Sequence, residues 1–249
     1  MPLLFFMACK MSQTQVVEDD LNVYGVKEGI DMIYPDKLNN LYILTKKNRI
    51  LRYDSDMNFK YEYTNSNAGD ISLIDARNPQ KILAFAKDFN RIYVLDNTLA
   101  EITTIDLSQS NFYDISTIGG SNDNLIWLFD PVQQKLLKID DEARIQYESN
   151  RMSDYNLADL EPVKIHENTN KVIMSDPNKG LFVFDNFGHY LTQIDVKDVY
   201  EFQFIDSKIY YCKEGKMVGY DLRQFQNFAL PDSTGRGCYK WMNQKIYPY

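Results

Sequence analysis

The chain has 249 residues and carries 27 Lys and Arg against 35 Asp and Glu, which gives a formal net charge of −8 at pH 7. Binding to a nucleic-acid backbone or to an anionic membrane surface needs clustered cations, so this composition argues against both kinds of partner. The sequence contains no Walker loop, dinucleotide fingerprint or GxSxG nucleophile elbow, and therefore no motif of these enzyme classes.

The N-terminus has a short apolar segment from Leu3 to Ala8, followed by Cys9. This segment resembles the end of a signal peptide, and Phe6-Met7-Ala8-Cys9 resembles the cleavage box of bacterial lipoproteins, although Phe6 and Met7 depart from its usual residues. The resemblance implies export, lipidation of Cys9 and a place on the periplasmic face of a bacterial envelope. A plain signal peptide and a start codon placed too far downstream are the alternatives.

Residues 13–20 (QTQVVEDD) are polar and acidic, which is the composition of a tether. The predicted organisation is therefore a signal-like or lipoprotein-like segment with its tether at 1–20, followed by a single domain at 21–249.

Short strands follow the tether. Leu21–Tyr24 is a predicted edge strand, and Ile30–Tyr34 is a strand that Pro35 ends. The next stretch, LYILTKKNRILRYD, contains an apolar run, a polar turn, a second short run and then Asp54. Four later segments repeat this plan, and the successive Asp residues lie 42, 44, 45 and 36 residues apart, at Asp96, Asp140, Asp185 and Asp221. A period of about 40 to 45 residues made of short strands is typical of a propeller blade.

Each of the five repeats divides into four predicted strands. The second strand is apolar on both faces, as expected for a middle strand that packs between two neighbouring blades. The first repeat has Ile30–Tyr34, Leu41–Thr45, Arg49–Asp54 and Phe59–Thr64. The second has Ile71–Asp75, Lys81–Ala86, Arg91–Asp96 and Glu101–Asp106, and the third Asp114–Ile118, Asn124–Phe129, Lys135–Asp140 and Arg144–Glu148. The fourth has Pro162–His166, Lys171–Ser175, Gly180–Asp185 and His189–Asp195, and the fifth Tyr200–Ile205, Lys208–Cys212, Lys216–Asp221 and Gln224–Leu230.

The sequence thus predicts an all-β fold, a β-propeller of four-stranded antiparallel blades. Cys238–Met242 and Lys245–Tyr247 look like the first two strands of a further repeat. Together with Leu21–Tyr24 they would form an incomplete seam blade, which gives six blades. The alternatives are five blades with the chain ends packed against a rim, and a chain that is truncated.

With these Asp-terminated hairpins, the chain resembles the six-bladed propellers of the TolB-like and NHL-repeat kind. It also resembles uncharacterised envelope propeller lipoproteins of Bacteroidota, whose blades carry an aromatic and Phe-Asp pattern like that of Leu125 to Asp130 (LIWLFD). The resemblance covers residues 30–230 and implies the fold. Propellers of this kind include protein-binding scaffolds and calcium-dependent hydrolases, so the fold does not select a function.

The five repeated Asp residues stand where the third strand of each repeat turns into the fourth. An Asp in such a turn accepts hydrogen bonds from the backbone two residues on, so we interpret these residues as structural. Trp127 lies in the middle of an apolar strand. We interpret its ring as a wedge between blades, with stacking on a ligand as the alternative.

The first strand of each blade is expected to line the central channel. Carboxylates that converge there could hold Ca²⁺, which takes oxygen ligands from several chain segments. Carboxylates are also common in such a channel simply because it is wet, and this is the explanation we favour. The two histidines, His166 and His189, have no second His at metal-ligand spacing, and Gly119-Gly120-Ser121 has the composition of a turn. The candidate metal ligands are Asp31, Asp70, Asp114, Glu161 and Glu201.

Two functional hypotheses follow. The first is a non-enzymatic, monomeric envelope propeller whose rim loops or channel mouth bind a protein or a glycan, with membrane contact only through a lipid anchor. The second is a calcium-dependent hydrolase or lyase with its site in the channel. Cys212 and Cys238 are either core residues or, in an exported protein, a disulfide.

Overall fold

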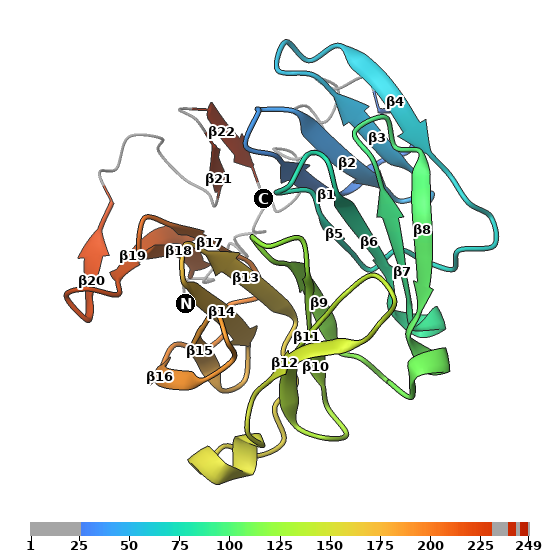
Figure 1. Cartoon of the computed structure of the whole chain (residues 1–249). Coiled ribbons are helices and arrows are strands. Elements are labelled where there is room, and N and C mark those ends of the chain that lie inside the picture. The colour runs from blue at the N-terminus through green and yellow to red at the C-terminus, as the bar shows by residue number, and fades with distance from the viewer. Residues whose placement is uncertain (1–25, 231–238, 243–244, 249) are drawn as a thin grey trace, which may run out of the picture.

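The computed structural model describes residues 26–230, 239–242 and 245–248. They form five four-stranded antiparallel sheets, each with its strands in chain order, and one two-stranded sheet (Figure 1). Within this part of the chain, helix is limited to three short 3-10 turns, η2 (Lys87–Phe89), η3 (Leu107–Ser110) and η4 (Met152–Tyr155). The predicted all-β class is therefore confirmed.

Each four-stranded sheet is one blade, and we number the blades in chain order. Blade 1 contains β1 (Ile30–Pro35), β2 (Leu41–Thr45), β3 (Ile50–Tyr53) and β4 (Phe59–Tyr63). Blade 2 contains β5 (Leu73–Asp75), β6 (Ile82–Ala86), β7 (Arg91–Leu95) and β8 (Glu101–Asp106). Blade 3 contains β9 (Thr117–Gly120), β10 (Ile126–Asp130), β11 (Lys135–Ile139) and β12 (Ile145–Glu148). Blade 4 contains β13 (Lys164–Asn168), β14 (Lys171–Asp176), β15 (Gly180–Asp185) and β16 (Tyr190–Ile194), and blade 5 contains β17 (Phe202–Ile205), β18 (Lys208–Lys213), β19 (Lys216–Asp221) and β20 (Gln226–Ala229).

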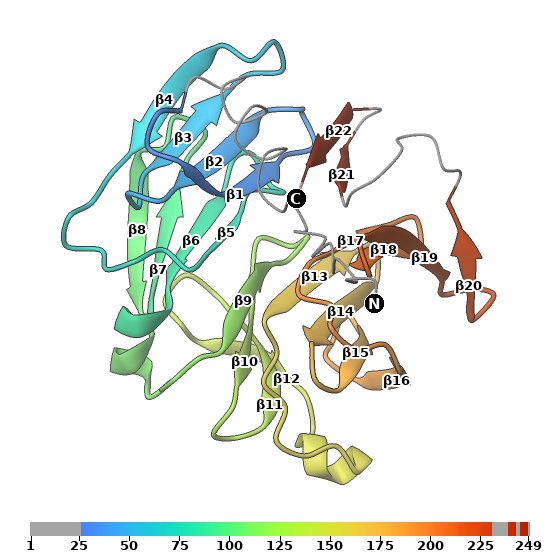
Figure 2. The ribbon, with the colours of Figure 1, turned by 180° about the vertical axis from the view of Figure 1, so that it is seen from behind.

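The blades follow one another around a common axis in chain order, as the two opposite views show (Figures 1 and 2). Their first strands approach one another near this axis, where β9 contacts both β5 and β13, and β13 contacts β17. The propeller prediction is confirmed, including the placement of the first strand of each blade on the inside.

The prediction of six blades is not matched by the structure, whose described residues complete five. The C-terminal strands β21 (Tyr239–Met242) and β22 (Lys245–Pro248) pair with each other as an antiparallel two-stranded sheet. In Figure 1 this sheet lies between blade 5 and blade 1. The third strand expected for a seam blade, Leu21–Tyr24, lies outside the described residues. The five-bladed alternative therefore agrees with the observed sheets.

Apolar contacts between successive blades form the core. In β6, Ile82 and Ala84 pack with blade 1, whereas Leu83 and Phe85 pack with blade 3. The middle strand is therefore buried on both faces, as its composition predicts. Similar clusters join blade 3 to blade 4 and blade 4 to blade 5. Each large apolar side chain removed from water contributes about 1.5 to 3 kcal/mol, so these clusters are the main force that holds neighbouring blades together.

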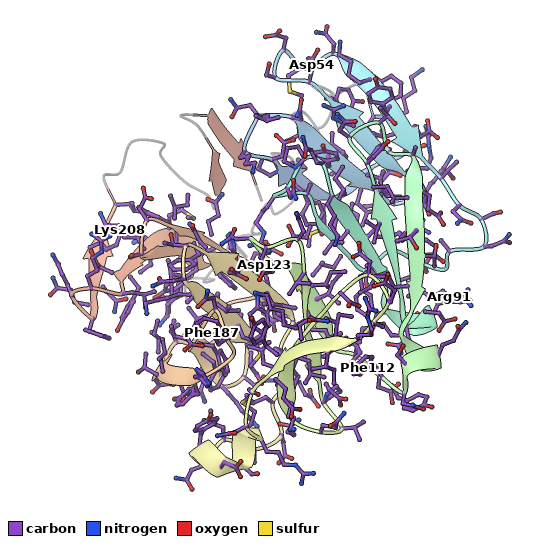
Figure 3. The ribbon with its side chains drawn as sticks, in the orientation of Figure 1. Asp54, Arg91, Phe112, Asp123, Phe187 and Lys208 are labelled. Atoms are coloured by element: carbon purple, nitrogen blue, oxygen red, sulfur yellow. The ribbon has the colours of Figure 1, made fainter. Side chains whose placement is uncertain are left out.

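The repeated Asp residues lie in the turns between the third and fourth strands. Each Oδ1 accepts the backbone N–H two residues on, over 2.7 to 3.0 Å. In blades 1 to 4 the same oxygen also accepts the N–H four residues on, over 2.9 to 3.0 Å. Figure 3 shows one of them, Asp54, at the outer end of blade 1. Backbone hydrogen bonds therefore occupy the carboxylates of all five repeated residues, Asp54, Asp96, Asp140, Asp185 and Asp221.

The prediction of a turn at Gly119-Gly120-Ser121 is wrong, because Gly119 and Gly120 belong to strand β9. A Cβ atom on Gly119 would lie 2.6 Å from the carbonyl oxygen of Ile165 in β13. Glycine is therefore needed here because the backbones of blades 3 and 4 approach too closely for a side chain.

We expect Gly119→Ala to lower the free energy of unfolding by about 1 to 3 kcal/mol, because one of the two inner strands must move to admit the methyl group. Urea unfolding followed by circular dichroism measures the change. The matched control is Gly120→Ala, whose Cβ would lie 3.4 Å from the nearest atom, an oxygen of Asp75, and should fit. Equal stabilities of the two variants would contradict the close-approach argument.

Candidate functional site

A cavity of about 80 Å³ lies on the axis and is lined by residues from all five blades. One water molecule needs about 10 to 15 Å³ of such space, so the cavity has room for roughly six waters or a ligand group with a similar number of heavy atoms. Its polar lining residues are Tyr34, Asp75, Arg77, Lys164, His166, Glu201 and Gln203.

Asp75 and Arg77 form an ion pair that joins three blades at the cavity wall. Nε of Arg77 lies 2.9 Å from Oδ1 of Asp75, and Nη2 donates to Oδ2. The backbone N–H of Gly120 donates to the same carboxylate over 2.7 Å. Arg77 also donates to the carbonyl oxygens of Gly120 and Glu167, over 3.0 and 2.9 Å. One guanidinium therefore connects β5, β9 and β13.

The Asp75–Arg77 pair makes the free energy of unfolding depend on pH at acid pH. Burial alone raises the pKa of the Asp75 carboxyl, but the charge and hydrogen bonds of Arg77 and the Gly120 N–H outweigh burial and hold this pKa well below its usual range. The unfolded chain, with an Asp pKa of about 3.9, takes up the proton first as the pH falls. The stabilisation is therefore complete above about pH 4 and is lost progressively below it.

We expect Asp75→Asn to be less stable than the wild type at neutral pH and to lose less stability between about pH 4 and pH 2, because the variant has no carboxylate to protonate. Denaturant unfolding at a series of pH values gives both quantities. If the two proteins lose the same stability over that interval, Asp75 is not the linked group.

A second ion pair also lines the cavity. Nζ of Lys164 pairs with the carboxylate of Glu201 and lies 5.6 Å from the centre of the Phe202 ring. The two charged side chains are only 17% and 19% exposed. Burial, and next the negative charge of Glu201, raise the pKa of the Tyr34 hydroxyl well above its usual range. Tyr34 therefore stays protonated at physiological pH.

His166 lies two residues after Lys164, on the same face of β13, and lines the cavity. Its ring centre lies 6.0 Å from that of Phe202. Burial, and then the positive charges of Arg77 and Lys164, lower the pKa of His166 well below its usual range, while Asp75 opposes them. The imidazole is therefore neutral at pH 7. Within the described part of the chain, its ring nitrogens have no hydrogen-bond partner and remain available to a group in the cavity.

The five predicted metal ligands are not brought together. Glu201 lines the cavity, whereas Asp31 is exposed on β1. The other three are exposed in the segments before β5, β9 and β13, at Asp70, Asp114 and Glu161. The described residues contain no group of three or more His, Cys, Asp or Glu that could hold a metal ion.

Asp75, Arg77 and Lys164 are not among the residues predicted from the sequence, which assigns no role to His166. The first strands of blades 2 to 5 begin two or three residues later than predicted, and Asp70, Asp114 and Glu161 lie before them, outside the cavity lining. The alternation of Lys164 and His166 around buried Ile165 was an available signal, since it is the pattern of a strand with one wet face.

A buried polar network supports the cavity wall from behind, between blades 3 and 4. Oε2 of Glu167 accepts hydrogen bonds from Trp127 Nε1 and Ser121 Oγ, each over 2.5 Å. Asn122 donates to Oε1 over 3.2 Å. Nζ of Lys138 lies 3.9 Å from the Glu167 carboxylate and 4.9 Å from the centre of the Trp127 ring. The Trp127 side chain is completely buried between the two blades.

No protein-family model matches the chain, and no curated protein matches it. Several solved structures do. A streptogramin B lyase is 15% identical with a TM-score of 0.61, and the match covers 84% of this chain and 71% of that one. Selenomethionine-substituted virginiamycin B lyase from Staphylococcus aureus is 14% identical with a TM-score of 0.61, over 84% and 72% of the two chains. A catalytically inactive histidine-to-alanine variant of the Staphylococcus aureus enzyme, with quinupristin, is 15% identical with the same TM-score and coverage. At these identities the likeness shows the fold alone, a β-propeller.

Proposed function

We propose that the protein is a non-enzymatic binding module of the bacterial cell envelope, and that its axial cavity holds a group of a protein or glycan partner. The observation that carries this proposal is the cavity, in which polar side chains from blades 2, 4 and 5 converge next to the aromatic rings of Tyr34 and Phe202. A concave site with a few convergent polar groups and apolar walls is the usual form of a ligand site.

The charges of the cavity favour binding over catalysis. Asp75 and Arg77 hold three blades together, and Lys164 and Glu201 are paired with each other. The two negative charges, on Asp75 and Glu201, and the two positive charges, on Arg77 and Lys164, cancel. A ligand in the cavity therefore meets hydrogen-bonding groups rather than a strong net electric field. Such groups fix the orientation of a ligand and give specificity.

Capture of partners from an envelope extract tests the proposal, with three proteins as bait: the wild type, Lys164→Ala and Tyr113→Ala. Tyr113 is exposed and does not line the cavity, so its replacement is the matched control. We expect a partner that the wild type and the control retain and that Lys164→Ala loses. Equal retention by all three baits would place the partner elsewhere on the ring and contradict the proposal.

We propose further that the protein is exported and anchored through Cys9, which lies outside the described residues. The apolar segment before Cys9 supports export. Cys212 is disulfide-bonded, and disulfides persist in oxidising compartments; its predicted partner, Cys238, also lies outside the described residues. Metabolic labelling with a fatty-acid analogue tests the anchor, since Cys9→Ser should lose the label and an unlabelled wild type would disprove it.

Among the described residues, no helix is long and apolar enough to cross a membrane.

The second candidate function is an enzyme that works in the same cavity, and His166 is the observation that favours it. A neutral imidazole with available nitrogens is able to take a proton from a substrate. Lyases occur among the similar solved structures, one of them as an inactive histidine-to-alanine variant, but the low identity limits that likeness to the fold. Turnover of a captured ligand by the wild type, and its loss in His166→Ala, would favour this candidate.

The hydrolase or lyase hypothesis drawn from the sequence requires Ca²⁺ in the channel. We expect about 1 mM Ca²⁺, a level that fills weak extracellular sites, to leave the melting temperature unchanged. The reason is that the predicted carboxylates are dispersed and Glu201 is paired with Lys164. A rise in melting temperature that EDTA reverses and Glu201→Gln abolishes would contradict this expectation and restore the metal-dependent alternative.

A further inference from the structure

The cavity wall has more hydrogen-bond donors than its own groups use. Lys164 has three N–H donors and makes one described hydrogen bond, to Glu201. Nη1 of Arg77 has two N–H donors and makes one described hydrogen bond, to the carbonyl oxygen of Glu167. Neutral His166 supplies one further N–H. Asp75, in contrast, accepts hydrogen bonds on both of its oxygens. Lys164, Arg77 and His166 therefore keep N–H donors that can serve a bound group.

These donors lie close together. The Phe202 ring lies near Lys164 and His166 of β13. Its centre is 5.6 Å from Nζ of Lys164 and 6.0 Å from the centre of the His166 ring. The guanidinium of Arg77 reaches the backbone of Glu167, the residue after His166. Donors from β13 and from Arg77, two residues after β5, therefore line neighbouring parts of a cavity that has room for only a few heavy atoms.

The net charge around His166 determines which kind of ligand group these donors can bind. The groups that face it are Arg77 and Lys164 with positive charge, Asp75 and Glu201 with negative charge, and uncharged Tyr34. Their sum is zero while the imidazole is neutral. A bound anion would add one negative charge in a buried site, which is costly unless a positive charge accompanies it. Protonation of His166 supplies that charge.

Resting on the proposed function, we propose that the axial cavity recognises a carboxylate of its ligand, held by Lys164, His166 and Arg77, and that binding draws one proton onto His166. The proton comes from solvent and stays on the imidazole while the carboxylate is bound, so no covalent bond of the ligand changes. A free small acid, an acidic sugar and the C-terminus of a peptide all carry this group.

Isothermal titration calorimetry of the full chain at pH 7, in two buffers with different protonation enthalpies, tests the proposal. The probes are acetate, glucuronate and N-acetylglycine, each beside its neutral counterpart, acetamide, glucose or N-acetylglycinamide. We expect at least one acid to bind tenfold or more tightly than its neutral counterpart, with uptake of close to one proton. Its affinity should fall as the pH rises, because binding is linked to proton uptake. The acid that binds best identifies the source of the carboxylate.

Variants separate the three roles. His166→Asn keeps an N–H donor but cannot take the proton, so acid binding should weaken and the proton uptake should disappear. Lys164→Gln should weaken acid binding at least tenfold, and Lys164→Arg, which preserves the pairing with Glu201, should weaken it less. The matched control is Lys208→Gln, because Nζ of Lys208 lies 5.3 Å from the centre of an aromatic ring, that of Phe228, on blade 5 and outside the cavity lining (Figure 3).

Three results would overturn the carboxylate proposal: acids that bind no better than their neutral counterparts, acid binding without proton uptake in the wild type, and no binding of any probe. Tighter binding of inorganic phosphate than of every acid would also overturn it and assign the site to a phosphoryl group. In each case the binding-module proposal stands as long as capture of a partner depends on Lys164, so the two failures are distinguishable.

Discussion

Trp127→Ala is expected to lower the free energy of unfolding by about 3 to 5 kcal/mol, among the largest effects in this protein. The ring is completely buried against Phe129, Ile165 and Phe182, so its loss leaves a cavity between blades 3 and 4. It also removes the N–H that donates to the carboxylate of Glu167. Urea unfolding followed by far-ultraviolet circular dichroism measures the change without relying on tryptophan fluorescence.

Two controls divide this effect into its parts. Trp127→Phe keeps an aromatic ring in the core but removes the hydrogen bond to Glu167, so it should cost an intermediate amount, about 1 to 3 kcal/mol. Phe59→Ala removes an aromatic ring that is 53% exposed, and it should change stability by about 0.5 kcal/mol or less. A Trp127→Ala protein that unfolds like the wild type would show that the ring does not wedge the two blades.

The second large effect is expected for Glu167→Ala, which should lower the free energy of unfolding by about 3 to 5 kcal/mol. Removing one member of a buried charged network leaves its partners without compensation. Trp127, Ser121 and Asn122 lose their common acceptor. Lys138, whose side chain is 2% exposed, loses the buried carboxylate beside it and keeps its ion pair with the half-exposed Asp123. Chemical denaturation measures the loss, and Glu142→Ala, which removes an exposed carboxylate, is the control.

A double-mutant cycle shows whether the charge is the cause. Lys138→Met replaces the buried ammonium with an apolar chain of similar length, so the double variant Glu167→Ala, Lys138→Met should cost less than the sum of the two single variants. Strict additivity would mean that Glu167 stabilises the fold through its hydrogen bonds alone, and not through the nearby positive charge.

Much of the fold could be predicted because the second and third strands of each blade are apolar runs between polar turns. The third strands Gly180–Asp185 and Lys216–Asp221 have the predicted bounds. The first strands could not be placed as well. Ile71 and Ile115 are buried although they precede β5 and β9, so the apolar pattern continues beyond the start of each strand. Such a pattern records burial and does not record where strand pairing begins.

The location of the candidate site in the channel could be predicted, but of its charged residues only Glu201 could. A strand exposes alternate residues, so an error of a few positions in its start changes which side chains are assigned to the axis. The ties between Arg77 and the carbonyl oxygens of Gly120 and Glu167 join residues 43 and 90 positions apart. No local pattern encodes contacts across such distances.

The hydrogen bond between Arg77 and the carbonyl oxygen of Glu167 also has a consequence for folding during synthesis. A growing polypeptide exposes the guanidinium long before the ribosome has synthesised the segment around Glu167, and until then the carbonyl oxygen of that residue does not exist for it to bind. Completion of the cavity wall is therefore a late event in biogenesis, because the tie from Arg77 to blade 4 forms only after blades 1 to 3 have been synthesised.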